Sequence, residues 1–329
     1  MKTNLKFIGI DLSKYTLDIC ILWEGQCQSY VIANKAKSIV NFFEKHLDAH
    51  HQHHICIENT GKYGWSLTRL LSKLSCCFYM VHPLHLKRSL GLVRGKNDAI
   101  DALRIAQFIK KNYDQLPPYI PRRQVIESLQ LLLSERSYKV KQGQQLKTKN
   151  KEFQVLQANE LIKSLTDNNQ KLIEQLNAQI KTLETEIKQL IKGDLTLKRL
   201  DEQLRSIPGV GYILSWNILV KTNEFKTIND PRKLACYAGV APFSKRSGVS
   251  VFGKSRVSAF ADKSLKKLLH LAAISAIRLN NDMRVFYQRK VEQGKNKMSV
   301  LNAVRNKIIH IIFALIKNQS FYQNRLVVS

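Results

Sequence analysis

The chain contains 329 residues, and its 53 Lys and Arg outnumber its 25 Asp and Glu, which gives a net charge of +28 and a pI near 9.9. Because so many unneutralised cations repel one another, this composition predicts a polyanionic partner, with nucleic acid favoured over an anionic membrane surface. A membrane-spanning protein is not expected, since the longest apolar run near the C-terminus covers only 308–316 and is interrupted by His310, whereas a bilayer takes about 20 residues to cross.

The N-terminus and the cysteines both favour a cytoplasmic protein. The apolar run 7–10, before Asp11, is too short for a signal peptide. The cysteines show no CxxC pair and no zinc-type spacing, so reduced thiols are expected. They are Cys20, Cys27, Cys56, Cys76, Cys77 and Cys236. The length predicts about two domains that each bury a core.

Residues 1 to about 115 alternate strand and helix patterns. Apolar runs predict strands, and spaced apolar residues predict helices between them. The expected strands are 7–10, 17–22, 55–57 and 76–81, and the expected helices are 38–46 and 65–74. This order predicts an α/β layer fold with a mixed sheet.

The proline-rich stretch 114–123 predicts a boundary, after which the chain becomes polar, helical and free of proline up to about residue 200. Apolar residues there follow a short heptad pattern. They are Ile173, Leu176, Ile180, Leu183, Ile187 and Leu190. The pattern fits a single amphipathic helix packed on its own protein, an antiparallel helical hairpin, or self-association.

The last segment, about 201–318, is predicted to be mainly helical, with core helices at 265–277 and 300–316 and a loop-rich middle at 239–253. Residues 201–329 hold 22 Lys and Arg against 7 Asp and Glu, which contributes +15 of the net charge. The polyanion is therefore expected to lie mainly along this part of the chain.

Four acidic residues stand where a strand ends or a helix begins. Asp11 and Glu58 end predicted strands, and Asp98 and Asp101 occupy the first turn of a helix that Asn97 caps. Each taken alone also fits a turn residue or a helix cap. Together they predict an oxygen-rich site for Mg²⁺ or Mn²⁺, where two ions about 3.5–4 Å apart can assist phosphoryl transfer.

Two basic or glycine-rich segments could contact phosphates. The Ile207-Pro208-Gly209-Val210-Gly211 turn resembles the hairpin of helix-hairpin-helix modules, in which glycines let backbone N–H groups approach a phosphate. An ordinary helix–helix turn is the equal alternative. The segment 239–256 combines serines, glycines and four cations, and it fits a serine nucleophile or a basic loop that only touches phosphates. The cations are Lys245, Arg246, Lys254 and Arg256.

The order of these motifs resembles the IS-one-ten family of Piv-like DEDD transposases from insertion sequences, over about residues 5–315. The motifs that carry the resemblance are Gly9-Ile10-Asp11, Ile57-Glu58-Asn59-Thr60-Gly61, Asn97-Asp98-Ala99-Ile100-Asp101-Ala102, Ile207-Pro208-Gly209-Val210-Gly211, Tyr237-Ala238-Gly239-Val240-Ala241-Pro242 and Ser247-Gly248. Together they are highly specific, although no single one is.

The resemblance implies three domains: a RuvC-like domain of ribonuclease H fold at 1–115, a helical coiled-coil connector at 116–200, and a mainly α-helical transposase domain at 201–329. It implies that Asp11, Glu58, Asp98 and Asp101 are the metal ligands and that Ser247 is the nucleophile, with Ser244 and Ser250 as alternatives. Nucleic-acid binding is assigned to Gly209, Gly211, Lys245, Arg246, Gly248, Lys254 and Arg256. Family members join a circular element to target DNA, some with a structured guide RNA, and two protomers are thought to share a composite site.

One stretch departs from the family pattern. After the Ser-Gly loop the family has Lys-x-Gly-Asn-x-x-Leu-Arg, whereas this chain has no Gly-Asn pair in 261–268. We predict a Mg²⁺-dependent DNA recombinase that is homodimeric or homotetrameric, binds DNA without a membrane, and lies in the bacterial cytoplasm near the nucleoid. The alternatives are a hydrolytic RuvC-like nuclease or junction resolvase that uses the carboxylates alone, and a structural nucleic-acid-binding protein.

Overall fold

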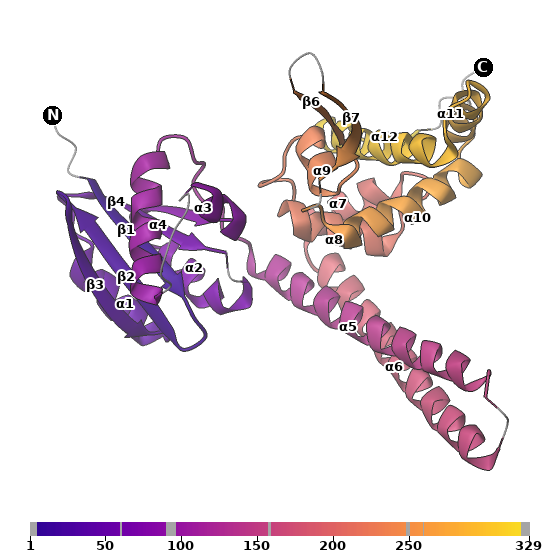
Figure 1. Cartoon of the computed structure of the whole chain (residues 1–329), viewed down its shortest axis with the longest axis horizontal. Coiled ribbons are helices and arrows are strands. Elements are labelled where there is room, and N and C mark those ends of the chain that lie inside the picture. Colours follow the sequence, from indigo (N-terminus) through magenta and orange to yellow (C-terminus); the bar gives the residue numbers. More distant parts are fainter. Residues whose placement is uncertain are drawn as a thin grey trace. The chain divides into compact units, whose positions relative to one another are not determined.

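The computed structural model describes residues 5–59, 61–89, 97–156, 159–247, 251–258 and 260–323, and of residues 62, 244–247 and 251–256 it describes the backbone alone. The chain divides into two compact units, Met1–Pro121 and Arg122–Ser329. Figure 1 shows their elements in chain order. Each unit is described by itself.

Unit 1 is built on a five-stranded mixed sheet with the order β3-β2-β1-β4-β5. Its strands are β1 (Leu5–Leu12), β2 (Thr16–Trp23), β3 (Gln26–Ala33), β4 (Gln52–Glu58) and β5 (Cys77–Val81). The first three strands form an antiparallel meander, and β4 and β5 then run parallel to β1. The four predicted strands are confirmed, and the mixed sheet with them.

Helices cover both faces of this sheet because alternate strand residues point to opposite sides and both sets are apolar. The helices α1 (Ala36–His46) and α2 (Trp65–Leu71), the latter entered through the short η1 (Gly61–Gly64), pack on one face. On the other face lie α3 (Pro83–Ser89) and α4 (Asp98–Asn112). The predicted helices at 38–46 and 65–74 correspond to α1 and α2.

Gly9 lets α4 lie directly on β1. A Cβ atom at residue 9 would stand 2.1 Å from the carbonyl oxygen of Ala102 and 2.2 Å from the nitrogen of Ala106, both of which belong to α4. Only glycine permits this approach, and the alanines on the facing side of α4 are equally small. The contact fixes the start of α4 near the end of β1.

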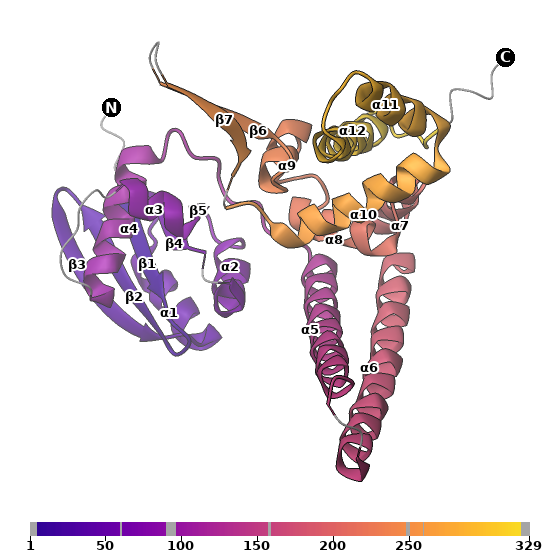
Figure 2. The ribbon, with the colours of Figure 1, turned by 45° about the vertical axis from the view of Figure 1, so that its right-hand side comes forward.

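Unit 2 begins with two long helices, α5 (Gln124–Phe153) and α6 (Glu160–Lys192), that lie side by side (Figure 2). They are antiparallel: Nε of Arg136 donates to Glu184 at 2.8 Å, and Asn169 donates to Asn150 at 2.8 Å. Ile173 and Ile187 of the heptad pattern are buried. Of the three alternatives for that pattern, the structure contains the antiparallel hairpin.

The rest of unit 2 is a helical bundle with one strand pair. Its helices are α7 (Leu195–Arg205), α8 (Tyr212–Thr222), α9 (Pro231–Tyr237), α10 (Lys263–Leu279), α11 (Asn281–Glu292) and α12 (Lys297–Lys317). The segment 239–253 was expected to be rich in loops, but β6 (Pro242–Ser247) and β7 (Val251–Val257) pair there as antiparallel strands. Backbone hydrogen bonds form this pair from residues whose composition is typical of a loop.

Among the described residues, α12 is the one helix that is long and apolar enough to cross a membrane by length and composition alone. Such a helix is weak evidence for a membrane span, since core helices pass the same test. In this chain Val304, Ile308 and Ile312 of α12 are fully buried in the hydrophobic core of unit 2. The helix therefore serves as a core helix of the bundle.

Candidate active site

Asp11 and Glu58 meet at one edge of the sheet in unit 1. The parallel strands β1 and β4 pair Ile10 with Ile57, so the two acids follow paired residues on neighbouring strands. Asp11 is partly buried, and its Oδ1 accepts a hydrogen bond from the Leu12 N–H at 3.0 Å. The strand ends thus bring two predicted site residues together.

The first turn of α4 adds Asp98 and Asp101. Asn97 caps this helix as predicted, since its side chain accepts a hydrogen bond from the Ala99 N–H at 3.1 Å. Asp101 also accepts a hydrogen bond from Nη1 of Arg104 at 2.7 Å, in an ion pair one turn along the helix. Arg104 therefore neutralises part of the charge that the four acids carry.

The four carboxyl groups act on one another electrostatically. Burial, opposed by the hydrogen bond from Leu12 and assisted by the negative charges of Asp98, Asp101 and Glu58, raises the pKa of Asp11 to about 6. Like charges disfavour the ionised form in this way only at short range. Asp98, Asp101 and Glu58 therefore lie near enough to Asp11 for their charges to act on it.

Asp18 is a fifth acid that the sequence analysis missed. It lies on β2 directly opposite Asp11 in the antiparallel register, so both side chains point to the same face of the sheet. Burial and the charge of Asp98 raise its pKa above the ordinary value. The signal was available in principle, because a tight turn between 12 and 16 pairs these two positions.

The chemistry of the cluster fits a hard divalent cation. All donors are carboxylate oxygens, and the accumulated negative charge would be relieved by a cation. Within the described part of the chain, no three His, Cys, Asp or Glu side chains stand close enough to hold a metal directly. Mg²⁺ accepts such a site, because it usually keeps several water ligands and uses only one or two carboxylates.

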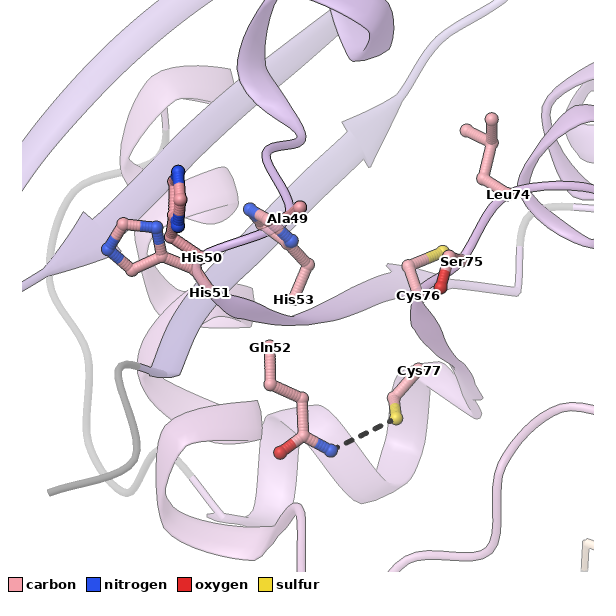
Figure 3. A pocket seen from close by; sticks show the side chains of 9 residues that line it. All are labelled: Ala49, His50, His51, Gln52, His53, Leu74, Ser75, Cys76 and Cys77. Atoms are coloured by element: carbon pink, nitrogen blue, oxygen red, sulfur yellow. Dashed lines mark hydrogen bonds between the residues drawn. The ribbon is translucent and has the colours of Figure 1, made fainter. Parts of the chain in front are cut away.

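A cavity of about 680 Å³ lies at the opposite end of β4, before and at the start of the strand. Figure 3 shows that His50, His51 and His53 gather on one side of it, while Cys76 and Cys77 lie on the other. His51 contacts Asp48 at 2.6 Å, and burial raises the pKa of the Cys76 thiol to about 11. Among the described residues no three His, Cys, Asp or Glu side chains stand close enough to hold a metal, and the raised pKa keeps the Cys76 thiol protonated near pH 7.

Ser247, the predicted nucleophile, ends β6 and pairs with Val251 at the far end of the strand pair. Its side chain lies outside the described residues, as do Gly248 and Ser250 and the side chains of Ser244, Lys245, Arg246, Lys254 and Arg256. The backbone register alone is described, with Arg246 opposite Phe252 and Lys245 opposite Gly253. The serine and the four cations remain predictions.

The two glycines of the turn between α7 and α8 differ in surroundings. Gly209 has a φ of +90°, and a Cβ there would stand 2.4 Å from the carbonyl oxygen of Ala272 in α10. Packing against α10 thus accounts for glycine at this position. Gly211 precedes α8, is exposed, and has no atom within 4 Å of the place a Cβ would take. Gly211 is the more accessible of the two for a phosphate.

The segment that departs from the family pattern has its own polar network. Asp262 caps α10 by accepting from the Leu265 N–H at 2.8 Å, and its Oδ2 also accepts from Nζ of Lys221 at 2.5 Å and from the Tyr237 hydroxyl at 3.2 Å. Although burial opposes it, the hydrogen bonds from Lys221 and Ser264 lower the pKa of Asp262 to about 2. These bonds hold the start of α10 against α8 and α9 without a Gly-Asn pair.

Comparison with known proteins identifies the class. The DEDD model of IS110 type, described as a transposase, matches residues 8–158, which include the four clustered acids. A second model, described as the transposase IS116/IS110/IS902 family, matches residues 201–288, which include Ser247. The chain is therefore a transposase, an enzyme of DNA recombination. It belongs to the IS116/IS110/IS902 family.

Several relatives support this assignment. A pilin gene-inverting protein of Moraxella lacunata is 27% identical over 328 residues, which cover 97% of this chain and 98% of the relative. The protein of that name from Moraxella bovis matches to the same extent. An uncharacterized 43.6 kDa protein of insertion element IS110 from Streptomyces coelicolor is 28% identical over 151 residues, or 46% of this chain and 36% of the relative.

Proposed function

We propose that the protein cleaves and rejoins DNA strands with a Mg²⁺-dependent carboxylate site and a serine nucleophile. The observation that carries the proposal is the placement of the four acids: Asp11 and Glu58 follow paired residues of β1 and β4, and Asp98 and Asp101 stand in the first turn of α4. The mixed sheet, with an antiparallel meander followed by parallel strands, supports a RuvC-like domain of ribonuclease H type in unit 1.

The proposal retains three functional parts, 1–115, 116–200 and 201–329. The α5–α6 hairpin would be the connector, and the bundle with the β6–β7 pair would be the transposase domain. Pilin gene inversion, named for the two Moraxella relatives, is a recombination reaction of the kind proposed. It supports strand exchange rather than simple hydrolysis as the outcome.

In the cleavage step, Oγ of Ser247 would attack the scissile phosphate. A new bond between this oxygen and phosphorus forms while the phosphorus–O3′ bond breaks, which leaves a 5′-phosphoserine on one DNA end and a 3′-hydroxyl on the other. The serine proton is lost to a carboxylate or water, and the departing oxygen takes up a proton. In the joining step, a 3′-hydroxyl of the partner strand attacks the phosphoserine and restores Ser247.

The carboxylates would hold the cation, and the basic side chains would hold the DNA. Asp11, Glu58, Asp98 and Asp101 are the proposed ligands of Mg²⁺ or Mn²⁺, which when bound stabilises the charge that develops on the scissile phosphate. Lys245, Arg246, Lys254 and Arg256 are proposed to contact the phosphate backbone, with Gly209, Gly211 and Gly248 allowing close approach of the chain to DNA.

The test is a covalent protein–DNA adduct that survives denaturation. We expect the wild-type protein to form it with Mg²⁺, Ser244→Ala to keep it, and Ser247→Ala and Asp11→Asn to lose it. Equal loss in both serine variants, or no adduct in any protein, would refute the serine assignment.

Two other functions give different outcomes in the same assay. A hydrolytic nuclease that uses the carboxylates alone predicts that Ser247→Ala still cuts DNA while Asp11→Asn does not. A structural nucleic-acid-binding protein predicts no cutting by any variant, with an affinity that falls steeply as salt rises. Mg²⁺-dependent cleavage by the wild type excludes this second function.

A structured guide RNA and a homodimer or homotetramer are further predictions that rest on the family resemblance. RNA that co-purifies with the protein, is resistant to deoxyribonuclease and derives from the element's own end would support the first. The mass of the protein in solution, measured with and without that RNA, tests the second.

A further inference from the structure

A basic groove in unit 2 lies beside the root of the β6–β7 strand pair. It has a volume of about 820 Å³, and Pro242 and Val257, which pair with each other across the two strands, form part of its wall. The remaining wall comes from the first turns of α10 and from α12. Its polar residues are Lys263, Lys266, Lys267, His270, Asn302 and Arg305, with Ser299 at the rim. No acidic residue lines it within the described part of the chain.

Arg305 is the unusual member of this set because it is buried. Its residue surface is only 6% exposed, and its Nε has no hydrogen-bond partner. Its Nη2 donates to Nδ1 of His270 at 2.6 Å, and its Nη1 donates to Oδ1 of Asn302 at 3.3 Å. Among the described residues, no carboxylate forms an ion pair with it. Burial accordingly lowers the pKa of Arg305 below its ordinary value.

Hydrogen bonds to neutral partners offset only part of the desolvation cost of a buried guanidinium. A phosphate oxygen would accept a strong, charge-assisted hydrogen bond from such a group. Three lysines of α10 line the same groove as Arg305: Lys263 and Lys267 are exposed, and Lys266 is half-buried. The positive charge at this place is therefore concentrated, and among the described residues no carboxylate forms an ion pair with Arg305 or these lysines.

His270 is positioned as a neutral hydrogen-bond donor. Because a guanidinium can only donate, Nδ1 of His270 must accept, so its proton sits on Nε2. Burial and the charge of Arg305 lower the pKa of His270, which keeps the ring neutral near pH 7. Arg305 thus fixes the tautomer of His270 and leaves an N–H donor.

We propose that this groove binds the phosphodiester backbone of a DNA strand next to the strand pair that carries Ser247. Arg305 supplies the fixed charge, His270 is oriented by it, and Lys263, Lys266 and Lys267 contact the adjoining phosphates. The groove would hold the DNA strand in place while the residues of the β6–β7 pair act on it. The inference rests on the proposed function for the identity of the polyanion, and none of these residues belongs to the predicted binding set.

The test measures DNA binding by fluorescence anisotropy over a range of salt concentrations. Each lost phosphate contact lowers the slope of log affinity against log salt by about 0.9 for duplex DNA, or roughly threefold in affinity over 50 to 200 mM salt. We expect the slope to fall by about 1.8 in Lys263→Gln/Lys267→Gln, because both side chains would release a phosphate. The matched control is Lys181→Gln/Lys192→Gln, which removes two exposed lysines of α6 and should leave the slope within about 0.3 of the wild type.

Arg305→Met probes the buried charge itself. If it folds, it should weaken DNA binding at least as much as the loss of one lysine; if it unfolds, the double lysine variant decides. Equal slopes in the groove variant and the control would overturn the proposal, as would a loss confined to RNA of the same sequence. Failure of the wild type to cleave DNA, with the slope effect intact, would refute the proposed function and leave this inference standing.

Discussion

Gly9→Ala is predicted to displace α4 from the sheet and to disable the acidic cluster. The added Cβ would lie 2.1 Å from one backbone atom of α4 and 2.2 Å from another, whereas ordinary contacts begin at 3.4 Å. Backbone atoms on both sides cannot rotate away, so the helix must retreat by roughly 1 Å, and forced shifts of this kind cost about 1–3 kcal/mol. Asp98 and Asp101 start this helix and would move with it.

The loss of stability in Gly9→Ala can be measured by thermal unfolding. We expect a loss near the upper limit, about 3 kcal/mol, which for a unit of this size lowers its melting temperature by about 10 °C. Because the movement separates Asp98 and Asp101 from Asp11, DNA cleavage should fall at least tenfold even well below the melting temperature. A variant with unchanged melting and full cleavage would refute the argument that Gly9 sets the position of the acids.

Two further predictions concern unit 2. Gly143→Ala in α5 should raise the free energy of unfolding by about 0.5–1 kcal/mol, since alanine is the better helix former and its Cβ would meet only Leu176 at 3.9 Å; urea denaturation checks this, and a loss of stability would count against the described hairpin. The pKa of Asp262 is lower in the folded chain than its unfolded value of 3.8, so the ionised carboxylate contributes about 2 kcal/mol to the free energy of unfolding above pH 4, and this contribution is lost as the pH falls toward 2. The difference in stability between the wild type and Asp262→Asn should therefore shrink over this range. A difference that stays constant with pH would contradict the prediction.

The sequence predicted those parts of unit 1 whose signal is local. The apolar runs of β1, β2, β4 and β5 mark buried strands, and Asn97 before an amphipathic stretch marks the start of α4. The strand β3 was missed because it is an edge strand with mostly exposed residues. The β6–β7 pair was missed because Gly, Ser and basic residues are typical of loops, whereas pairing between strands depends on backbone hydrogen bonds.

The functional residues that were not predicted from the sequence depend on contacts between distant parts of the chain. Asp18 becomes visible only when the register of β1 and β2 is known. Arg305 and His270 lie 35 residues apart on two helices, and their contact arises from the packing of α10 on α12. The glycine requirement at Gly209 likewise follows from the backbone of α10 rather than from the turn that contains it.

The length of the α5–α6 hairpin is set by the number of residues in its two helices. A helix of 33 residues extends about 50 Å, the length of about 15 base pairs of B-DNA. The two helices hold each other through the Arg136–Glu184 and Asn150–Asn169 contacts, so the pair should resist bending more than a single helix. Removing seven residues from each helix keeps the same side chains facing each other and shortens the hairpin by about 10 Å, close to three base-pair steps.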